Sequence, residues 1–204
     1  MVAHDFRSPL TSIRGYAELL REAVVPPEVA LDSIERGADQ LLRLVDDLTG
    51  TATELDREPL DLAELVRAAV DCAQPYAQES GIVIQLDTAA APILGDAHRL
   101  ALALDNLVGN AVKYAPGGSV RVKVERDDPV VAVEVADTGV GIPEGEVPRL
   151  FDRFFRASTS SMFAGTGIGL SVVKAVIEAH GGSIEVTSKP GAGSVFRVEL
   201  PVRP

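Results

Sequence analysis

The sequence is poor in the residues that build disulfide scaffolds, membrane spans and nucleic-acid surfaces. A single cysteine, Cys72, occurs among 204 residues, which excludes an intramolecular disulfide framework and fits a reducing compartment. No apolar run reaches the roughly 18–20 residues that cross a bilayer, and no signal peptide is visible. Lysine and arginine number 19 against 30 acidic residues, a net charge of −11. That balance argues against nucleic acid or an anionic membrane as the main partner.

Several well-known sequence signatures are also absent. There is no P-loop, and the His-Arg-Asp, Asp-Phe-Gly and Val-Ala-Ile-Lys patterns of the common serine/threonine kinases do not occur. We find no internal repeat and no low-complexity tract. His98 and His180 lack metal-ligand spacing, so we assign them structural or solvent roles. With 46% hydrophobic and 24% charged residues, the composition is that of an ordinary globular protein.

The first fifty residues carry two amphipathic helical patterns. Apolar residues recur every three or four positions in residues 4–22 and again in residues 28–52. The run Val24-Val25-Pro26-Pro27 interrupts the pattern, so we expect an antiparallel helical hairpin. Two helices cannot bury both apolar stripes alone. We therefore expect a homodimer that forms a four-helix bundle, with packing of the hairpin on the rest of the chain as the alternative.

A histidine and an aspartate open the first of these helices. Neutral imidazole is a nucleophile that titrates near neutral pH, and Asp5 can hold the other ring N–H of His4. Ser8 shares the face of His4 one turn on. Pro9 removes the helical partner of the Asp5 carbonyl, which loosens the helix beside His4. The alternative is a helix start at which these residues are incidental.

The second part of the chain reads as an α+β domain. We place the boundary near residue 57, which gives domains of residues 1–57 and 58–204. Asp61 and Asp96 are expected N-caps of two helices. Helices are predicted over residues 62–78, 96–114 and 170–179, and strands over 82–86, 119–125, 129–137, 183–188 and 194–200. Because the helices and strands do not alternate strictly, we expect an α/β sandwich with helices on one face of a mixed sheet.

Two asparagines share one face of the helix over residues 96–114. Asn106 and Asn110 stand four residues apart, and Lys113 follows one turn later. Because asparagine competes for backbone hydrogen bonds in helices, two asparagines on one helix face indicate a role other than helix formation. Amide oxygens can ligate Mg²⁺, and lysine can pair with phosphate. The alternative is an exposed polar face.

The strand that ends at Asp137 leads into glycine-rich turns. A carboxylate there can accept a hydrogen bond from an exocyclic amine such as that of adenine. Gly139 and Gly141 let the backbone approach a flat ligand closely. The later run from Gly165 to Leu170 precedes a helix, and helix N-termini favour phosphate. Each glycine cluster taken singly is also typical of ordinary turns.

Taken together, these segments resemble the catalytic core of two-component sensor histidine kinases, and the resemblance covers essentially the whole chain. The matching motifs are the H box at residues 4–10, the N box at 106–114, the G1 box at 137–141, the F box at 151–154, the G2 box at 165–170 and a further glycine turn at 191–194. Five boxes in this order and spacing argue strongly against a chance match.

The resemblance implies chemistry for the first helix. His4 is the residue phosphorylated by ATP, and the phosphoryl group then passes to an aspartate in the receiver domain of a response regulator. Asp5 is the acid–base partner of His4. In family members that also act as phosphatases, the residue four positions after the histidine orients the attacking water. That residue is Ser8 here, where Thr or Asn is usual, so phosphatase activity stays open.

The resemblance also implies an ATP and Mg²⁺ site. Asp137 reads the adenine amine, Asn110 with Asn106 handles Mg²⁺, and residues 144–166 form a mobile lid. Lys113 and Tyr114 contact phosphate and base. The full nucleotide-binding set comprises Asn106, Asn110, Lys113, Tyr114, Asp137, Gly139, Gly141, Phe151, Arg153, Phe154, Arg156, Gly165, Thr166, Gly167, Gly169 and Leu170.

The lid departs from the family pattern. Residues 157–164 contain no lysine or arginine, where family members often carry basic residues. We expect Arg153 and Arg156 to supply the positive charge near the γ-phosphate instead. The alternative is that the apolar side chains of Met162 and Phe163 act as latches that pack the lid down. The linker near residues 54–59 is expected to act as a hinge between the two domains.

Three rival functions remain open from the sequence. The chain could serve as an ATP-binding, non-catalytic dimeric scaffold, or as a member in which phosphatase activity dominates. A serine kinase of the anti-sigma type shares the ATP fold but lacks the H-box hairpin. Met1 stands three residues before His4, so we expect a fragment whose upstream sensor domain is missing. We expect it to be cytoplasmic, and the sequence leaves open whether the parent protein is membrane-anchored.

Overall fold

The structure is a computed structural model that describes residues 2–34, 36–37, 55–163, 165 and 167–202, with the backbone alone for residues 2–7. The chain divides into two compact units, residues 1–54 and 55–204. The domain limits expected from the sequence, 1–57 and 58–204, stay a prediction.

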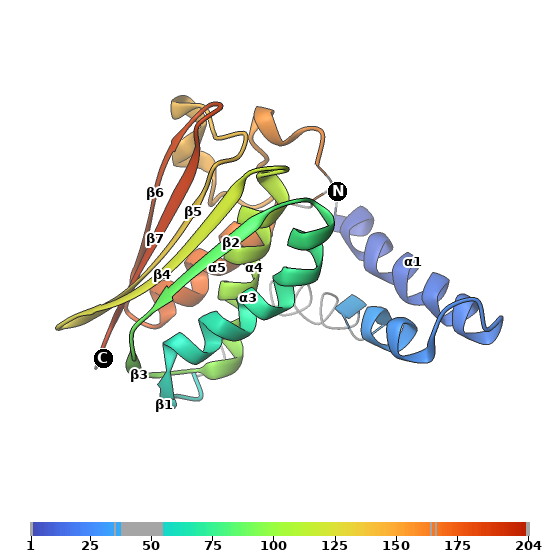
Figure 1. The fold of residues 1–204 in the computed structure, drawn as a ribbon, viewed down its shortest axis with the longest axis horizontal. Coiled ribbons are helices and arrows are strands. Elements are labelled where there is room, and N and C mark those ends of the chain that lie inside the picture. The colour runs from blue at the N-terminus through green and yellow to red at the C-terminus, as the bar shows by residue number, and fades with distance from the viewer. Residues whose placement is uncertain (1, 35, 38–54, 164, 166, 203–204) are drawn as a thin grey trace. The chain divides into compact units, whose positions relative to one another are not determined.

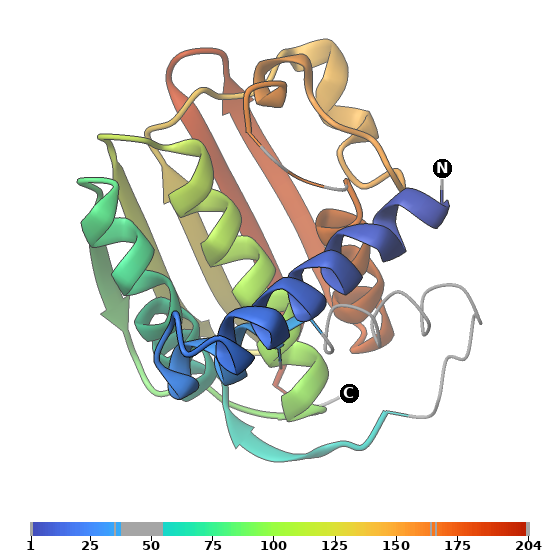
Figure 2. The ribbon, with the colours of Figure 1, turned by 90° about the vertical axis from the view of Figure 1, so that its right-hand side faces the viewer.

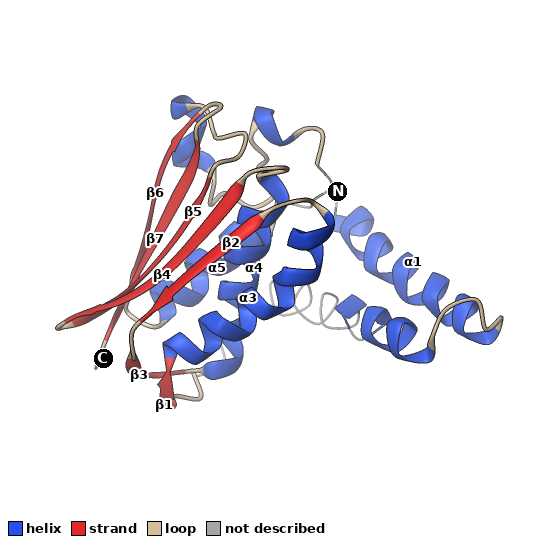
Figure 3. Cartoon of the chain, viewed as in Figure 1, coloured by secondary structure: helices blue, strands red, loops and turns tan. Residues whose placement is uncertain are grey.

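The first unit contains a helical hairpin. Helix α1 runs from Val2 to Arg21 and continues through Pro9. After a short connection a second helical segment starts at residue 27, and its described part reaches residue 37 (Figure 3). The two helices are close, because a Cβ on Gly37 would lie 2.6 Å from a side-chain carbon of Ile13. The remainder of the helix expected over residues 28–52, from residue 38 onward, lies outside the described residues.

The second unit is built on a five-stranded sheet in the order β2-β4-β5-β7-β6. Strand β2 pairs parallel with β4, and the other three pairings are antiparallel. The strands are β2 (Val83–Thr88), β4 (Ser119–Asp127), β5 (Val130–Asp137), β6 (Ser183–Lys189) and β7 (Gly193–Pro201). The sheet is therefore mixed, as the sequence predicted.

Three helices cover one face of this sheet, and the other face is left open (Figures 1 and 2). They are α3 (Leu62–Glu79), α4 (Ala97–Tyr114) and α5 (Gly169–Ala179). The core lies between helices and sheet: valines at alternate positions of β4 and β5 are buried against apolar helix positions such as Leu107 and Ile177. The predicted sandwich, with helices on one face, is confirmed.

Local chemistry explains where the helices begin and end. The Asp61 carboxylate accepts a hydrogen bond from the Ala63 amide at 3.0 Å, and Asp96 accepts one from the Arg99 amide at 3.0 Å. Both predicted N-caps are thereby confirmed. Helix α5 ends at Ala179 with His180 as its C-cap, and Gly181 follows with a φ of +78°, a left-handed conformation that favours glycine.

Several short elements were not predicted. Strand β1 (Glu58–Asp61) pairs antiparallel with β3 (Pro92–Gly95) in a separate two-stranded sheet. Two 3₁₀ helices, η1 (Glu144–Arg149) and η2 (Ser158–Ser160), lie within the lid segment. Among the described helices, none combines the length and apolarity needed to cross a membrane.

Candidate functional site

Asp137 occupies the last position of β5 and is buried, with 8% of its surface exposed. Burial raises the pKa of its carboxyl, and hydrogen bonds from the backbone N–H groups of Gly139 and Ser194 oppose that rise. The Gly139 amide donates to Oδ1 at 2.7 Å. The strand end thus holds a carboxyl in a fixed orientation with little water around it, as recognition of a single amine requires.

The turn after Asp137 fits against the end of α4 because it carries glycine. A Cβ on Gly139 would overlap the Tyr114 carbonyl oxygen, and that same oxygen accepts a hydrogen bond from the Val140 amide at 3.1 Å. Gly141 has a φ of +62° and lies against the Lys189 carbonyl. The close approach expected from these glycines is therefore made first to the protein's own backbone.

The two asparagines of α4 are half-buried, and Asn106 faces the start of α5. The Asn106 amide group donates to the Leu102 carbonyl at 2.9 Å, which fixes its orientation. Its Oδ1 lies 2.6 Å from the place a Cβ on Gly169 would take. Gly169 is the first residue of α5, so the amide oxygen of Asn106 points to a helix N-terminus, where anions bind favourably.

The end of α4 and the lid share an aromatic contact. The rings of Tyr114 and Phe163 meet edge-on, with centroids 5.0 Å apart and planes at 75°. The Lys113 ammonium lies over the Tyr114 ring, 4.8 Å from its centroid. Gly165 is adjacent, since a Cβ there would lie 3.0 Å from Lys113 Nζ. Of the two expected latches Phe163 makes this contact, whereas Met162 is 91% exposed.

The F box and the G2 loop are joined by backbone. The Phe154 amide donates to the Gly167 carbonyl at 2.9 Å. Phe154 has a φ of +66°, which is uncommon for a residue with a side chain. Gly167 has a φ of +76°, and a Cβ there would lie 2.6 Å from the Phe155 carbonyl oxygen. The loop therefore needs glycine at this position.

Arg156 of the lid makes hydrogen bonds within its own segment. Arg156 Nη2 donates to the Ser160 carbonyl at 2.8 Å and also to the Phe163 carbonyl. This guanidinium therefore closes a turn of its own segment. Arg153 is exposed. The ammonium nitrogen of Lys174 lies over the Phe151 ring, 5.5 Å from its centroid. Leu170, the last residue of the G2 box, packs against the core. A role for Arg153 and Arg156 at the γ-phosphate stays a prediction.

A hollow of about 500 Å³ lies beside Lys113 and Phe163. Its lining comes from α3, α4 and the lid: Ala73, Tyr76, Gly109, Val112, Lys113, Met162 and Phe163. Lys113 and Phe163 are thus common to the hollow and to the aromatic contact. Thr166 lies outside the described residues.

The H box lies on the first turns of α1. His4 and Asp5 are within this helix, and their side chains lie outside the described ones. Ser8 is exposed and Pro9 is buried. The expected approach of His4 to the nucleotide site stays a prediction.

Sequence reasoning missed two hydroxyl groups that hold the G1 turn. Ser188 Oγ accepts a hydrogen bond from the Ile142 amide at 2.9 Å, and Thr159 Oγ1 donates to the Gly141 carbonyl at 2.6 Å. Thr159 thereby ties the lid to the turn after Asp137. Nothing in the sequence around these residues signals the role, because serine and threonine are common in strands and turns.

Two family models match the chain. "Histidine kinase-, DNA gyrase B-, and HSP90-like ATPase" matches residues 95–204, which includes every predicted nucleotide-site residue. "His Kinase A (phospho-acceptor) domain" matches residues 1–54, which include His4.

Individual proteins match over nearly the whole chain. The signal transduction histidine-protein kinase/phosphatase MprB of Mycobacterium sp. is 34% identical, over 98% of this chain and 42% of that protein. Full-length ShkA in complex with AMPPNP has a TM-score of 0.72 and 34% identity, over 97% of this chain and 44% of that one. Histidine kinase ThkA in complex with response regulator protein TrrA has a TM-score of 0.66 and 27% identity, over 98% of this chain and 60% of that one. The curated relatives are longer, and the chain spans 26% to 47% of the length of those matched here.

Proposed function

The chain belongs to the two-component sensor histidine kinases, and on that premise we propose that it transfers the γ-phosphoryl group of ATP to His4 and then to an aspartate of a response regulator. The observation that carries the proposal is that one polypeptide joins a phospho-acceptor match containing His4 to an ATPase match containing Asp137. We assign residues 1–57 to dimerisation and phosphotransfer and residues 58–204 to ATP binding.

In the proposed reaction a ring nitrogen of His4 attacks the γ-phosphorus. A P–N bond forms, the bond from that phosphorus to the bridging oxygen breaks, and ADP leaves with the electron pair. The Asp5 carboxylate accepts a hydrogen bond from the other ring N–H of His4 and stabilises the positive charge that develops on the ring. Phosphoryl transfer needs positioning and charge neutralisation more than covalent help from the protein. This fits a division in which one unit holds the nucleophile and the other holds the donor.

The geometry of the second unit supports the nucleotide roles that we propose. The buried Asp137 carboxylate would accept a hydrogen bond from the adenine amine. Lys113 is adjacent to Gly165 in the G2 loop, and its ammonium would pair with phosphate there. Tyr114 offers a ring to the base once Phe163 moves away from its edge. The Phe163–Tyr114 contact is thus the closed form of a lid that nucleotide has to open.

Mg²⁺ would be held mainly by nucleotide and by amide oxygen. Among the described residues no group of three His, Cys, Asp or Glu could hold a metal ion. The donors available at the site are the amide oxygens of Asn106 and Asn110, which suit a hard cation that keeps several of its waters. The ion would supply charge neutralisation for the phosphates.

The proposal is tested by label transfer from γ-labelled ATP with Mg²⁺ to the full chain, in the wild type and in His4→Gln and Asp137→Asn. We expect label on the wild type, none on His4→Gln and little on Asp137→Asn. A bound but unreacted nucleotide in the wild type would instead support the scaffold function. Label on His4→Gln equal to the wild type would refute His4 as acceptor.

We propose that the hairpin also forms the homodimer. Leu10 on α1 and Leu31 on the following helix are 52% and 50% exposed in the single chain. Two helices leave such side chains in water, and a second copy can cover them in a four-helix bundle. The response regulator is the other protein partner, as in the ThkA complex.

A phosphatase activity on the phosphorylated regulator is a second candidate. Ser8 is exposed four residues after His4 on α1, and its hydroxyl can orient a water molecule. The relative MprB is described as a kinase/phosphatase. Ser8→Ala is expected to abolish dephosphorylation of a phosphorylated receiver domain while His4 labelling persists. Equal dephosphorylation by wild type and Ser8→Ala would exclude Ser8 from that reaction.

A further inference from the structure

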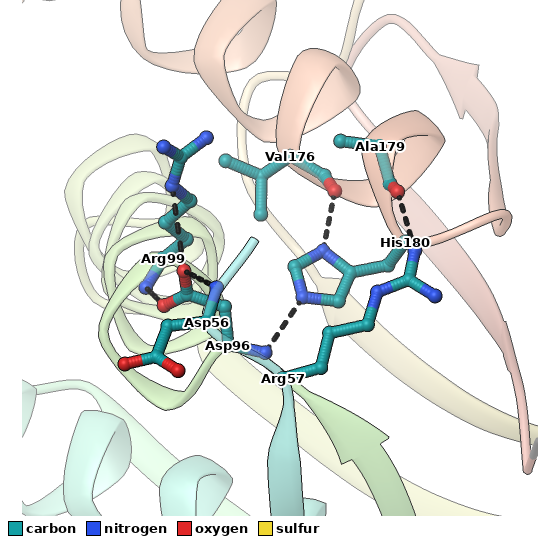
Figure 4. A network of polar contacts seen from close by, with 7 residues as sticks. All are labelled: Asp56, Arg57, Asp96, Arg99, Val176, Ala179 and His180. Atoms are coloured by element: carbon teal, nitrogen blue, oxygen red, sulfur yellow. Dashed lines mark hydrogen bonds and ion pairs between the residues drawn. The ribbon is translucent and has the colours of Figure 1, made fainter. Parts of the chain in front are cut away.

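His180, at the end of α5, is a buried histidine with both ring nitrogens engaged. It is 3% exposed. Nε2 accepts a hydrogen bond from the Asp96 amide at 2.9 Å, and Nδ1 lies 2.7 Å from the Val176 carbonyl (Figure 4). Because an amide can only donate and a carbonyl can only accept, the ring must be neutral with its proton on Nδ1. Burial lowers the pKa of His180, which favours this neutral form.

The Asp96 side of this network lies at the start of α4. One carboxylate oxygen of Asp96 accepts from the Arg99 amide, and the other lies 3.5 Å from Arg99 Nε. Gly95 lets the imidazole lie against the backbone, since a Cβ there would lie 3.3 Å from the ring and 2.7 Å from Leu100. The imidazole therefore links the C-terminus of α5 to the N-terminus of α4.

The same network holds the segment that enters this unit from the linker. The Asp56 amide donates to Asp96 Oδ2 at 3.3 Å, and Arg57 Nη2 donates to the Ala179 carbonyl at 3.0 Å. The chain then forms β1, in which Glu58 pairs with Gly95. The charged groups that face His180 are Arg57, Asp96 and Arg99. We call this arrangement, from Asp56 through β1 together with Gly95, Asp96 and His180, the linker seat.

We propose that His180 is a positioning residue that makes the linker seat rigid and thereby fixes the linker to both helices of the nucleotide site. Helix α4 carries Asn106, Asn110 and Lys113 of the proposed nucleotide site, and α5 runs from Gly169, beside Asn106, back to the seat. Displacement of the entering segment would then move the donor site as one body. Residues 56–58 would therefore be part of this body, although the sequence placed them within a hinge.

This inference rests on the proposed kinase function, because a positioning residue acts by presenting bound ATP to His4. A loose seat would leave the pocket intact but misplace it, and misplacement remote from the chemistry costs about 10- to 100-fold in rate. The effect should fall on kcat for His4 labelling, with the KM for ATP unchanged.

Two substitutions at one position separate linkage from simple packing. His180→Gln places an amide oxygen near the position of Nε2 and can still accept from the Asp96 amide. In this variant the Val176 carbonyl still accepts the hydrogen bond from the backbone N–H of residue 180, which is 3.2 Å long in the wild type. His180→Asn reaches only the position of Nδ1 and leaves the Asp96 amide without its acceptor. Asp56→Ala is the control, because only the backbone amide of Asp56 takes part.

The test measures kcat and KM for ATP in His4 labelling on the full chain. We expect His180→Asn to lower kcat about 10-fold or more at unchanged KM, with His180→Gln and Asp56→Ala close to the wild type. Equal kcat in all four proteins, or a loss in His180→Asn that appears as a raised KM, would overturn the inference. If His180→Asn does not fold, kcat is measured instead on Arg57→Ala, which removes the hydrogen bond of an exposed residue to the Ala179 carbonyl. An unchanged kcat in Arg57→Ala would then overturn the inference.

Hydrogen exchange separates failure of the seat from failure of the proposed function. The Asp56 amide should be protected in the wild type and in His180→Gln, and should exchange faster in His180→Asn. This readout needs no phosphoryl transfer. Absence of His4 label with the expected exchange pattern would refute the kinase function alone, whereas an unprotected Asp56 amide in the wild type would refute the seat.

Discussion

Asp137 combines two requirements that oppose each other. Recognition of an amine needs an ionised acceptor, while burial at the end of β5 raises the pKa of the carboxyl and disfavours its charge. The backbone amides of Gly139 and Ser194 partly offset that penalty. The residue thus costs folding stability in the free protein and gains its charge-stabilising partner when a nucleotide binds.

The substitution Asp137→Asn separates those two effects. Affinity for a non-hydrolysable ATP analogue should fall by about 1.5–3 kcal/mol, on the order of 10- to 100-fold, because an amide offers fewer acceptor sites to the adenine amine. The melting temperature of the nucleotide-free protein should stay equal or rise, since the buried charge is gone. Titration calorimetry and thermal unfolding measure the two quantities. Unchanged affinity would remove Asp137 from the site.

His180 makes the stability of the second unit depend on pH. Its pKa is lowered in the folded protein, so the unfolded chain binds the proton more readily. The stabilisation is complete above the unfolded pKa of about 6.5 and is lost as pH falls through the folded value. The free energy of unfolding should therefore decline with acidity by up to about 1.4 kcal/mol per pH unit.

Urea unfolding between neutral and mildly acidic pH, on the wild type and His180→Gln, isolates this contribution. Both proteins share every other titrating group, so the difference between their curves belongs to residue 180. We expect the difference in the free energy of unfolding between the wild type and His180→Gln to become smaller as pH falls. A gap that stays constant across the range would contradict the neutral, doubly bonded imidazole.

At the scale of elements, the Phe163–Tyr114 pair is the aromatic contact described between the lid and α4. Phe163→Ala removes the edge contact with Tyr114, which is worth about 0.5–1.5 kcal/mol beyond its buried area. Limited proteolysis within residues 144–166, without nucleotide, should therefore be faster in Phe163→Ala. Met162→Ala is the matched control, because that neighbour is 91% exposed and should be cleaved like the wild type. Equal cleavage of both variants would show that Phe163 does not hold the lid.

The sequence predicted the long elements well and the short ones poorly. Helices α3 and α4 were found because Asp61 and Asp96 mark their starts and an apolar stripe follows each. Strands β1 and β3 were missed because each has four residues and a proline. They exist only by pairing with each other across about thirty positions of sequence, which no local pattern reports.

The candidate site divides in the same way. Gly139 and Gly141 were expected to let the backbone approach a flat ligand, which stays a prediction, and their close contacts with the protein's own backbone came only from the structure. The role of Arg156 at phosphate stays a prediction, and its hydrogen bonds to carbonyl oxygens of its own segment came only from the structure. His180 was assigned a structural or solvent role, and its buried bonds to α4 depend on tertiary packing that composition and spacing do not report.

At the scale of the whole molecule, association through the hairpin is the expectation that the exposed leucines support. Leu31→Glu should weaken dimerisation at least tenfold, since each copy loses a buried leucine worth about 1.5–3 kcal/mol. Sedimentation equilibrium measures the dissociation constant. Val83→Glu, at a 60% exposed apolar position on β2 of the second unit, is the control and should dimerise like the wild type. Equal weakening by both substitutions would place the interface elsewhere.

The central claim is that the ATP-binding unit phosphorylates a ring nitrogen of His4. Its most direct test is to identify the phosphorylated residue after incubation of the full chain with ATP and Mg²⁺, by mass spectrometry together with the stability of the bond. The account predicts a single phosphoryl group on His4, labile in acid and stable in alkali as a phosphoramidate is. An acid-stable phosphate on a serine or threonine, with His4 unmodified, would contradict it.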